Sequence, residues 1–463
     1  MKKYEVVVVG AGISGLLSAL ALSKEGNSVL VIEKDNFIGG VCRSYNVGGY
    51  TVDTGPHAIT RMESGPLKQL MDEYFDVIPN FVPFGKYHIR MGNKVRPFPW
   101  SIKKWLTFDI LPAEDRMLLM RSVFDVLYML SIGKNISDIS IEDITPQNLS
   151  QESKHFLNYL SYFMLGTSPR NAPISRFIDN KSHKIDSRSA PYVGRLYNLL
   201  MGDGASDQLY PRGGIQKVID SIIMSFPKNN VEIKTGEKVI AIDIDNNKTA
   251  KIVITDRCEY GCDAVIYSGP SSKLPDIIKN NKDCMQEDYI QNLRNIKTVN
   301  SLSIWLGLKK KIFDGYGSEM WISLDPDSNP YTWVVPTSNY DANLAPIGRQ
   351  LVGFAFIVPD GHSIADMRIK ALESIFNTLP EIEENVEMIH YQELVPEKAC
   401  WSINSGFGDV QTPIKNLYCV GSDSERRSMG LTRSAYSVLR CLEIMRYDGN
   451  LGRGCEPLKI ANV

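Results

Sequence analysis

The first 33 residues constrain the fold more than any other part of the chain. Tyr4–Val9 is a run rich in β-branched side chains, as in a strand buried on both faces of a parallel sheet. The glycine-rich turn Gly10–Gly15 follows and leads into a helical apolar pattern that closes at Gly26. A second strand, Ser28–Ile32, ends in Glu33. This order of strand, G-x-G-x-x-G turn, helix, strand and acid predicts a Rossmann-type dinucleotide-binding unit.

Each glycine of the turn has its own physical task. Gly10 allows the tight turn, Gly12 lets the backbone approach a pyrophosphate, and Gly15 permits close packing of the helix on the sheet. The helix N-terminus offers N–H groups and a positive dipole end to phosphates. Glu33 would accept hydrogen bonds from an adenosine ribose, which disfavours a 2′-phosphorylated cofactor. The predicted nucleotide contacts in this unit are Gly10, Gly12, Ile13, Ser14, Gly15, Glu33 and Lys34.

Composition narrows the class of protein. The chain has 463 residues, 51 Lys+Arg and 53 Asp+Glu, and this balance argues against a nucleic-acid binder. Apolar residues make up 43%, enough for a large core. The eight cysteines lack regular spacing, which is typical of a reduced intracellular protein. The apolar run Val6–Leu22 is shorter than the ~20 apolar residues of a spanning helix, so we expect a cytoplasmic protein without a transmembrane segment.

Two further motifs follow the second strand. Gly39-Gly40-Val-Cys-Arg43 comes directly after it, and Asp53-Thr-Gly55-Pro-His57 lies shortly beyond. With these motifs the sequence resembles the FAD-binding amine oxidase superfamily, which holds protoporphyrinogen oxidases, phytoene desaturases and UDP-galactopyranose mutases. The resemblance implies that Gly40 and Arg43 contact the ADP part of FAD. It also implies that the segment with Gly55 and His57 returns the chain toward the isoalloxazine ring.

Later stretches fit the same resemblance. Tyr210-Pro-Arg-Gly-Gly214 is similar to the turn that enters a helix in the family, and Val239 matches a valine whose backbone contacts adenine. The stretch 416–423 resembles the family's closing strand, after which a helix points its N-terminus at the flavin. Gly421 and Asp423 are the implied contacts there, although many members have an acid where this chain has Ser422. No cysteine lies in a covalent attachment motif, so we expect FAD to be bound non-covalently.

The order of the motifs predicts a discontinuous organisation. We expect an α/β fold in which a Rossmann-type, glutathione-reductase-like FAD-binding domain is built from residues 1–65, 205–275 and 410–463. Residues 66–204 should form a mostly helical part of a substrate domain, because 112–132 and 154–165 have helical periodicity. Residues 276–409 should form its mixed-sheet part, with strands at 302–308 and 350–358.

The sequence indicates the substrate-binding residues less clearly than the cofactor-binding residues. Trp401 and Phe407 lie in a stretch that places aromatic residues beside the flavin in amine oxidases, but they also suit core packing. Arg427 follows the Gly421 motif, near the offset of an arginine in mutase-like members, and is a candidate substrate-side charge. The strand at 299–305 has no counterpart of the lysine that amine-oxidising members hold near flavin N5. This absence counts against a simple amine oxidase.

Two basic stretches each allow two interpretations. Residues 86–108 mix bases with aromatic side chains, which fits either a membrane-surface contact or a solvated face over a buried aromatic cluster. The arginines at 170, 176, 188 and 195 could bind a diphosphate or carboxylates through bidentate hydrogen bonds, or could form surface ion pairs.

Other kinds of catalytic site lack support. Cys258-x-x-x-Cys262 has no second pair of ligands nearby, so we expect no metal. The chain has no Gly-x-Ser-x-Gly elbow and no Walker A loop. Hydride transfer to a flavin needs no obligatory side-chain base, so the sequence names no catalytic residue.

Three hypotheses for function follow. The first is an FAD-dependent oxidoreductase, similar to protoporphyrinogen oxidase and phytoene desaturase, that transfers hydride from a lipophilic small molecule to flavin N5. The second is a UDP-galactopyranose mutase-like flavoenzyme that acts on a sugar nucleotide without net redox change. The third is a flavoprotein with a structural or assembly role. An apolar tunnel would favour the first hypothesis, and clustered arginines in a polar cleft would favour the second.

Overall fold

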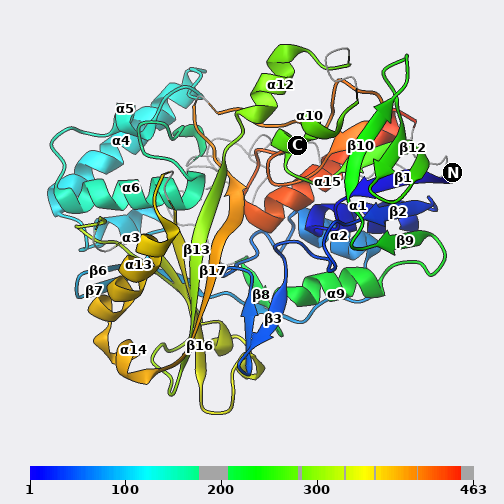
Figure 1. Ribbon diagram of the computed structural model, residues 1–463. Coiled ribbons are helices and arrows are strands. Elements are labelled where there is room, and N and C mark those ends of the chain that lie inside the picture. Colours follow the sequence, from blue (N-terminus) through cyan, green and yellow to red (C-terminus); the bar gives the residue numbers. More distant parts are fainter. Residues whose placement is uncertain (177–206, 280–283, 328–329, 359–360, 404, 450–463) are drawn as a thin grey trace.

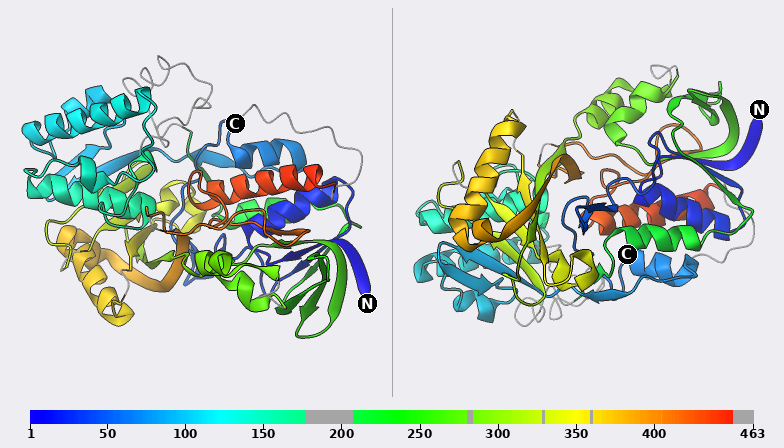
Figure 2. Two further views of the ribbon diagram at one scale, coloured as in Figure 1. Left: turned by 90° about the horizontal axis from the view of Figure 1, so that it is seen from above. Right: turned by 60° about the horizontal axis from the view of Figure 1, so that its bottom comes forward.

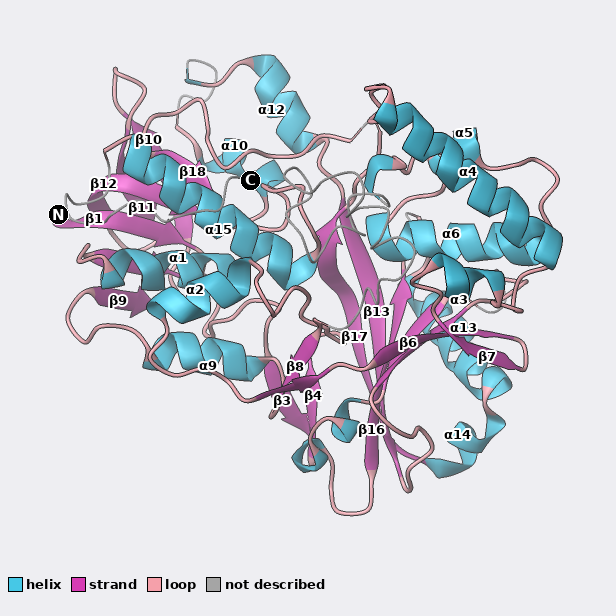
Figure 3. Ribbon diagram, turned by 180° about the vertical axis from the view of Figure 1, so that it is seen from behind, coloured by secondary structure: helices cyan, strands magenta, loops and turns pink. Residues whose placement is uncertain are grey.

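Two large sheets organise the molecule (Figure 1). The structure, a computed structural model, describes residues 1–176, 207–279, 284–327, 330–358, 361–403 and 405–449. Each sheet has seven strands, and helices cover the sheets on the outside (Figure 3). None of the helices in the described ranges is both long enough and apolar enough to cross a membrane.

The first sheet is the predicted Rossmann-type sheet. Its strand order is β10-β11-β12-β1-β2-β9, and β18 pairs with β12 beyond the end of β11. The strands β9, β2, β1, β12 and β18 run parallel, whereas β10 and β11 are antiparallel. Val6, Val7 and Val8 in β1 are almost fully buried, as the β-branched run predicts. The bounds are β1 (Lys2–Val9), β2 (Val29–Ile32), β9 (Val231–Lys234), β10 (Val239–Ile244), β11 (Ala250–Thr255), β12 (Glu259–Tyr267) and β18 (Leu417–Cys419).

Four helices share one hydrophobic core with this sheet. They are α1 (Ile13–Lys24), α2 (Pro66–Tyr74), α9 (Gln216–Met224) and α15 (Gly430–Tyr447). Figure 2 shows α1 and α15 side by side although they come from opposite ends of the chain. The buried Glu25 carboxylate accepts hydrogen bonds from Tyr74 of α2 and Arg446 of α15, which links these two helices to the end of α1. A second core on the other face includes α10 (Leu274–Ile277) and α12 (Glu287–Arg294), and the short helix η1 (Ser271–Lys273) directly precedes α10.

The second sheet is the predicted mixed sheet. Its order is β17-β13-β16-β15-β14-β6-β7, antiparallel except for the pair β14 and β6. The bounds are β6 (Lys86–Met91), β7 (Lys94–Pro97), β13 (Thr298–Leu308), β14 (Gly317–Trp321), β15 (Thr332–Val335), β16 (Gln350–Ile357) and β17 (Val386–Ala399). Strands β6 and β7 thus come from the segment that the sequence predicts to be mostly helical.

Helices cover the second sheet on both sides. A core on one side includes α13 (Ile364–Thr378) and α14 (Pro380–Asn385). The aromatic-rich core on the other side includes α3 (Ile102–Leu106), α4 (Ala113–Ser131) and α6 (Gln151–Leu165). The short elements α5 (Ile141–Ile144), η2 (Thr337–Asn339) and η3 (Ala342–Leu344) complete this part.

Two small antiparallel pairs connect the large sheets. They are β3 (Ser44–Val47) with β4 (Tyr50–Asp53), and β5 (Phe81–Pro83) with β8 (Leu209–Pro211). The carboxylate of buried Asp53 accepts hydrogen bonds from the Tyr210 hydroxyl at 2.6 Å and the Ile215 N–H at 3.0 Å. Asp53 therefore fixes the turn that enters α9. The division of the chain into domains at 65, 205, 275 and 410 stays a prediction.

Candidate functional site

The glycine turn leaves one side of the backbone open. Gly10 has a φ of +102°, which favours glycine, and a Cβ on Gly15 would lie 2.1 Å from the Gly10 carbonyl oxygen. A Cβ on Gly12 would meet no atom within 4 Å, and Gly12 caps α1 without a side-chain hydrogen bond. Gly10 and Gly15 are thus required by the protein itself, whereas Gly12 faces space that a ligand can approach. Ile13 and Ser14 form the first residues of α1 at this opening.

Glu33 is bound to the same turn. Its buried carboxylate accepts hydrogen bonds from the Ala11 N–H at 2.8 Å and the Asp35 N–H at 3.0 Å. A carboxylate has about four lone-pair sites, so both oxygens keep capacity for ribose hydroxyls. The Glu237 N–H donates to the Glu33 carbonyl at 3.0 Å, which brings the segment before Val239 to this position. Lys34 lies on the surface, 3.6 Å from the Asp35 carboxylate.

The Gly39–Gly40 pair packs directly on the glycine turn. The Gly39 N–H donates to the Ala11 carbonyl at 2.8 Å, and a Cβ on Gly40 would lie 3.3 Å from the Gly12 Cα. Arg43 follows, with its guanidinium 3.7 Å from the centre of the Phe37 ring. Its Nε is buried and has no hydrogen-bond partner among the described residues. The predicted ADP contacts therefore lie together, and one of them has an unsatisfied donor.

The segment with Gly55 and His57 is attached to β17. Gly55 has a φ of +74°, and its N–H donates to the Gln392 side chain at 2.8 Å. His57 Nε2 donates to the Thr54 carbonyl at 2.9 Å. Thr54 Oγ1 and Ser303 Oγ are buried beside this segment without partners in the described ranges. Sequence reasoning missed Gln392, which no motif distinguishes from other glutamines.

Gly421 and Asp423, the predicted cofactor contacts after β18, already have roles within the protein. A larger residue at position 421 would be strained, because Gly421 has a φ of +154° and a Cβ there would lie 3.2 Å from the Asp423 carboxylate. The Asp423 carboxylate accepts a hydrogen bond from the Ser271 N–H at 2.6 Å. Burial raises the pKa of Asp423 above its ordinary value, against the effect of these hydrogen bonds. Its contact with a ribityl chain stays a prediction.

Three buried cations lie beyond this loop. Arg433 in the first turn of α15 is fully buried and donates to the carbonyls of Ser428 at 3.0 Å and Ser422 at 3.1 Å. Burial lowers the pKa of Arg433 to about 10, so the side chain remains charged at neutral pH. Buried Arg176 also donates to the Ser428 carbonyl, at 2.6 Å. Ser428 has a φ of +61°, a strained conformation that the two guanidinium groups hold in place.

The third cation is a lysine on the second sheet. Lys398 in β17 lies opposite Val299 of β13, and its Nζ donates to the Phe163 carbonyl at 2.5 Å. Burial lowers the pKa of Lys398. The strand at 299–305, which has no lysine of its own, therefore has Lys398 on the neighbouring strand. Sequence reasoning missed Lys398 and Arg433, because only the strand register and the helix position reveal that they are buried.

Trp401 and Phe407 pack against each other and against the arginines. Their ring centroids are 5.9 Å apart in an edge-to-face arrangement. The Arg176 guanidinium lies 5.2 Å from the Trp401 ring, and the Arg433 guanidinium lies 5.4 Å from the Phe407 ring. Phe407 is buried, whereas Trp401 is half-buried. Phe407 therefore fits the core-packing alternative better, and Trp401 keeps an accessible surface.

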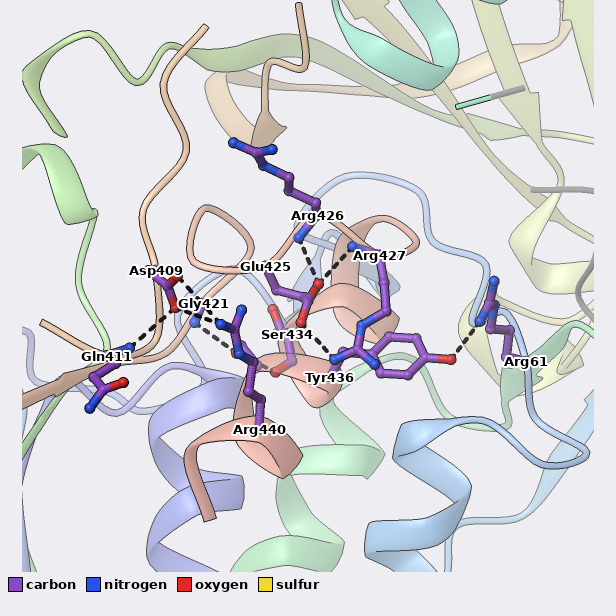
Figure 4. Close-up of polar contacts among 11 residues, drawn as sticks. Arg61, Asp409, Gln411, Gly421, Glu425, Arg426, Arg427, Ser434, Tyr436 and Arg440 are labelled. Carbon is purple, nitrogen blue, oxygen red and sulfur yellow. Dashed lines mark hydrogen bonds and ion pairs between the residues drawn. The ribbon is translucent and has the colours of Figure 1, made fainter. Parts of the chain in front are cut away.

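Arg427 is neutralised within its own loop (Figure 4). Its guanidinium donates to the buried Glu425 carboxylate at 2.8 Å and lies 4.4 Å from the Tyr436 ring. Glu425 also accepts the backbone N–H groups of Arg426 and Arg427. Burial alone would raise the pKa of Glu425, but Arg427 and these N–H groups hold it below its ordinary value. Figure 4 shows the Arg426 side chain pointing away from this pair.

The stretch 86–108 is mainly a packed aromatic cluster. Phe98, Trp100, Trp105 and Phe108 contribute to the core beside the second sheet, and Arg90 is paired with Glu319 at 2.7 Å. Arg188 and Arg195 lie outside the described residues. No group of three or more potential metal ligands occurs in the part of the chain that was described.

Comparisons with known proteins agree with this geometry. The chain is 23% identical over 404 residues to phytoene desaturase from Fusarium fujikuroi, covering 79% of this chain and 67% of that protein. The crystal structure of an oxidoreductase from Methanosarcina mazei superposes with a TM-score of 0.69 at 20% identity, covering 95% of this chain and all of the other. That of reduced UDP-galactopyranose mutase has a TM-score of 0.66 at 16% identity, covering 98% and 97% of the two chains.

The match to a family model shows the family to which the chain belongs. The model for flavin containing amine oxidoreductase matches residues 13–385, from the start of α1 to the end of α14. This range begins inside the glycine turn, at Ile13, and includes Glu33 and the strands of the second sheet apart from β17. The chain therefore belongs to the flavin-containing amine oxidoreductase family and is an FAD-dependent oxidoreductase.

Proposed function

We propose that this enzyme transfers hydride from a lipophilic small molecule to the N5 atom of FAD, in the manner of a desaturase. The observation that carries the proposal is that three arginines near Trp401 and the loop 421–429 are already bonded to groups of the protein itself. Arg176 and Arg433 are bonded to backbone carbonyls, and Arg427 is paired with Glu425. These side chains are therefore poorly suited to bind an anionic substrate. The similarity to phytoene desaturase over 79% of the chain supports the same conclusion.

The described residues fit FAD. Gly12 borders open space at a helix N-terminus, where a pyrophosphate would find unpaired N–H groups. Arg43 Nε, Thr54 Oγ1 and Ser303 Oγ are buried polar atoms that have no described partner and that suit hydrogen bonds to a ligand. The residues that would hold the ADP half are those of the glycine turn with Glu33, Gly40, Arg43 and Val239. When bound, FAD supplies the hydride acceptor.

The chain contributes orientation and electrostatics to this reaction. The N-terminus of α15 and buried Arg433 together place positive charge at the end of the loop 421–429. This charge would stabilise the anionic reduced cofactor. Trp401, with Phe407 packed against it, would hold an apolar substrate and exclude water from the reacting C–H bond. No side-chain base is needed, because the electron pair and the hydrogen leave together as hydride.

The proposal is tested by anaerobic reduction of the FAD-loaded protein. We expect loss of the oxidised flavin absorbance when detergent-dispersed polyenes or porphyrinogens are added, and no loss with UDP-sugars. Trp401→Ala should slow this reduction by roughly 10-fold or more, whereas Trp401→Phe should keep most of the rate, because burial of an aromatic face stabilises the bound substrate by about 1.5–3 kcal/mol.

The opposite result would support the mutase-like alternative. If only dithionite-reduced protein responds, and only to UDP-sugars, the desaturase-like proposal is wrong. The similarity to UDP-galactopyranose mutase shows a shared fold alone. Arg176, Arg433 and Arg427 are bonded within the protein, whereas exposed Arg426, 5.6 Å from the Phe407 ring, is the arginine that the mutase-like alternative would use.

A further inference from the structure

Helix α4 has an unusual distribution of side chains. A helix on the surface of a globular protein normally buries an apolar side and exposes a polar one. The side of α4 that faces the protein consists of Asp115, Leu119, Ser122 and Val126. Asp115 is satisfied there by the hydroxyl groups of Ser150 at 2.5 Å and Ser153 at 2.6 Å.

The opposite side of α4 is apolar. Met117, Phe124 and Tyr128 are spaced seven and four residues apart, which places them on one line along the helix. Their exposed fractions are 53%, 44% and 65%. Leu106 at the end of α3 and Ile132 after α4 extend the surface, with 46% and 60% exposed. We call these five side chains the α4 face.

Cations surround the α4 face. Arg121 lies on the same side of the helix, and Lys103 and Lys134 lie in the segments before and after it. These three side chains are exposed, and none makes an ion pair or side-chain hydrogen bond with another residue that the structure describes. Two exposed acids, Glu114 and Asp125, are also on α4. An exposed apolar line with flanking Lys and Arg is typical of helices that lie in a membrane interface.

The size of the α4 face favours a bilayer over a protein partner. Its side chains together expose roughly 500 Å², whereas a stable protein interface buries about 800 Å² on each partner. A bilayer needs no complementary shape and accepts a single row of apolar side chains. Figures 1 and 3 place α4 at the periphery, at the end of the molecule opposite the first sheet, where a flat surface can reach it.

The α4 face also lies near Trp401, the residue proposed to contact the substrate. Val126, on the buried side of α4, belongs to a small hydrophobic cluster with Leu165 and Ala172, and Trp401 packs against this cluster. The width of one helix, about 10 Å, therefore separates the exposed face from the cluster against which Trp401 packs. We propose that the α4 face docks on an anionic phospholipid bilayer and presents the substrate side of the enzyme to molecules dissolved in it. This inference rests on the proposed lipophilic substrate.

Vesicle binding by the full-length, FAD-loaded protein tests the inference. Flotation is measured with vesicles of phosphatidylcholine alone and of phosphatidylcholine with phosphatidylglycerol. We expect binding to both and tighter binding to the anionic vesicles. The double variant Phe124→Glu, Tyr128→Glu should reduce the partition coefficient by 10-fold or more, because each apolar side chain is then replaced by a charge.

A matched control comes from α13. Ile369→Glu changes a side chain that is 60% exposed on the other side of the second sheet, and it should leave vesicle binding unchanged. Thermal unfolding and flavin absorbance establish that each variant is folded.

Several outcomes would overturn the docking proposal. Wild-type protein that binds neither vesicle, or a double variant that binds as well as wild type, excludes the α4 face as a membrane contact. A dimer in lipid-free solution that the double variant dissolves would assign the face to a second copy of the chain. Binding is measured without substrate, so its failure leaves hydride transfer untouched. Intact binding without flavin reduction would count against the proposed function alone.

Discussion

The surroundings of the two sheets differ in whether their donor and charged groups already have partners within the protein. Around the first sheet, the glycine turn leaves open space at Gly12, and the nearby Arg43 Nε is buried without a partner among the described residues. Where α15 meets the end of β17, buried charged groups are bonded within the protein, because Arg433 of α15 and Lys398 of β17 both donate to backbone carbonyls. The difference supports our proposal that the glycine turn holds a charged cofactor and that the region around Arg433 and Lys398 takes an uncharged substrate.

Arg433 should show the largest effect on stability. Arg433→Met removes the buried donor of the Ser422 carbonyl and one of the two buried donors of the Ser428 carbonyl, and we expect a loss of about 3–5 kcal/mol in the free energy of unfolding. Arg433→Lys should recover part of it. Denaturant unfolding at neutral pH measures both. A loss below about 0.5 kcal/mol, the level of ordinary surface substitutions, would show that the region where α15 meets β17 does not depend on its buried charges.

Gly15 should be the most sensitive residue of the first half. In Gly15→Ala the new Cβ would lie 2.1 Å from the Gly10 carbonyl oxygen, so the turn or the helix has to shift. We expect about 2–3 kcal/mol of destabilisation together with loss of FAD. Denaturant unfolding and flavin content after gel filtration measure the two effects. Normal stability and full FAD content in this variant would contradict the structure of the turn.

Gly12 offers a matched comparison at the same turn. Gly12→Ala places a Cβ in space where no protein atom lies within 4 Å, so apoprotein stability should change by less than about 0.5 kcal/mol. FAD affinity should fall by roughly 10- to 100-fold, because the methyl group blocks the approach of the pyrophosphate. Fluorescence titration of apoprotein with FAD gives the affinity. Equal FAD affinity in the variant would mean that the cofactor does not cross Gly12.

Glu425 should give a smaller effect that depends on pH. Its pKa in the folded protein is below the ordinary value of 4.5, so the carboxylate stabilises the fold above that pH. This stabilisation is lost as pH falls through the lower, folded-state pKa. We therefore expect Glu425→Gln to lose about 1 kcal/mol at pH 7 and to approach wild type in acid.

The measurement for Glu425 is denaturant unfolding of both proteins at several pH values. Exposed Glu114, which has no ion pair with a described residue, provides the control Glu114→Gln. A difference between wild type and Glu425→Gln that is the same at every pH would exclude a role for the ion pair with Arg427.

Much of the first half could be predicted from local sequence. The residues of one strand, one turn and one helix determine the backbone conformation there, and the φ of Gly10 and the packing of Gly15 follow from it. For the second half, the sequence predicted individual helices and strands, such as β13, β16 and α13, but not which side chains contact one another. Its side-chain partners come from segments far apart in the chain, as with Lys398 and Phe163 or Gly55 and Gln392.

The sequence by itself therefore determined the cofactor class, because a pyrophosphate-binding turn is a local backbone structure that needs glycine at particular positions. Tertiary structure decided which charges are available to a ligand. Arg176, Arg427 and Lys398 have the same chemistry in the sequence as any surface cation. They are distinguished only by the burial of Arg176 and Lys398 and by the carbonyl or carboxylate partners of all three. Likewise, the apolar line on α4 is an ordinary helical pattern until the fold turns it outward.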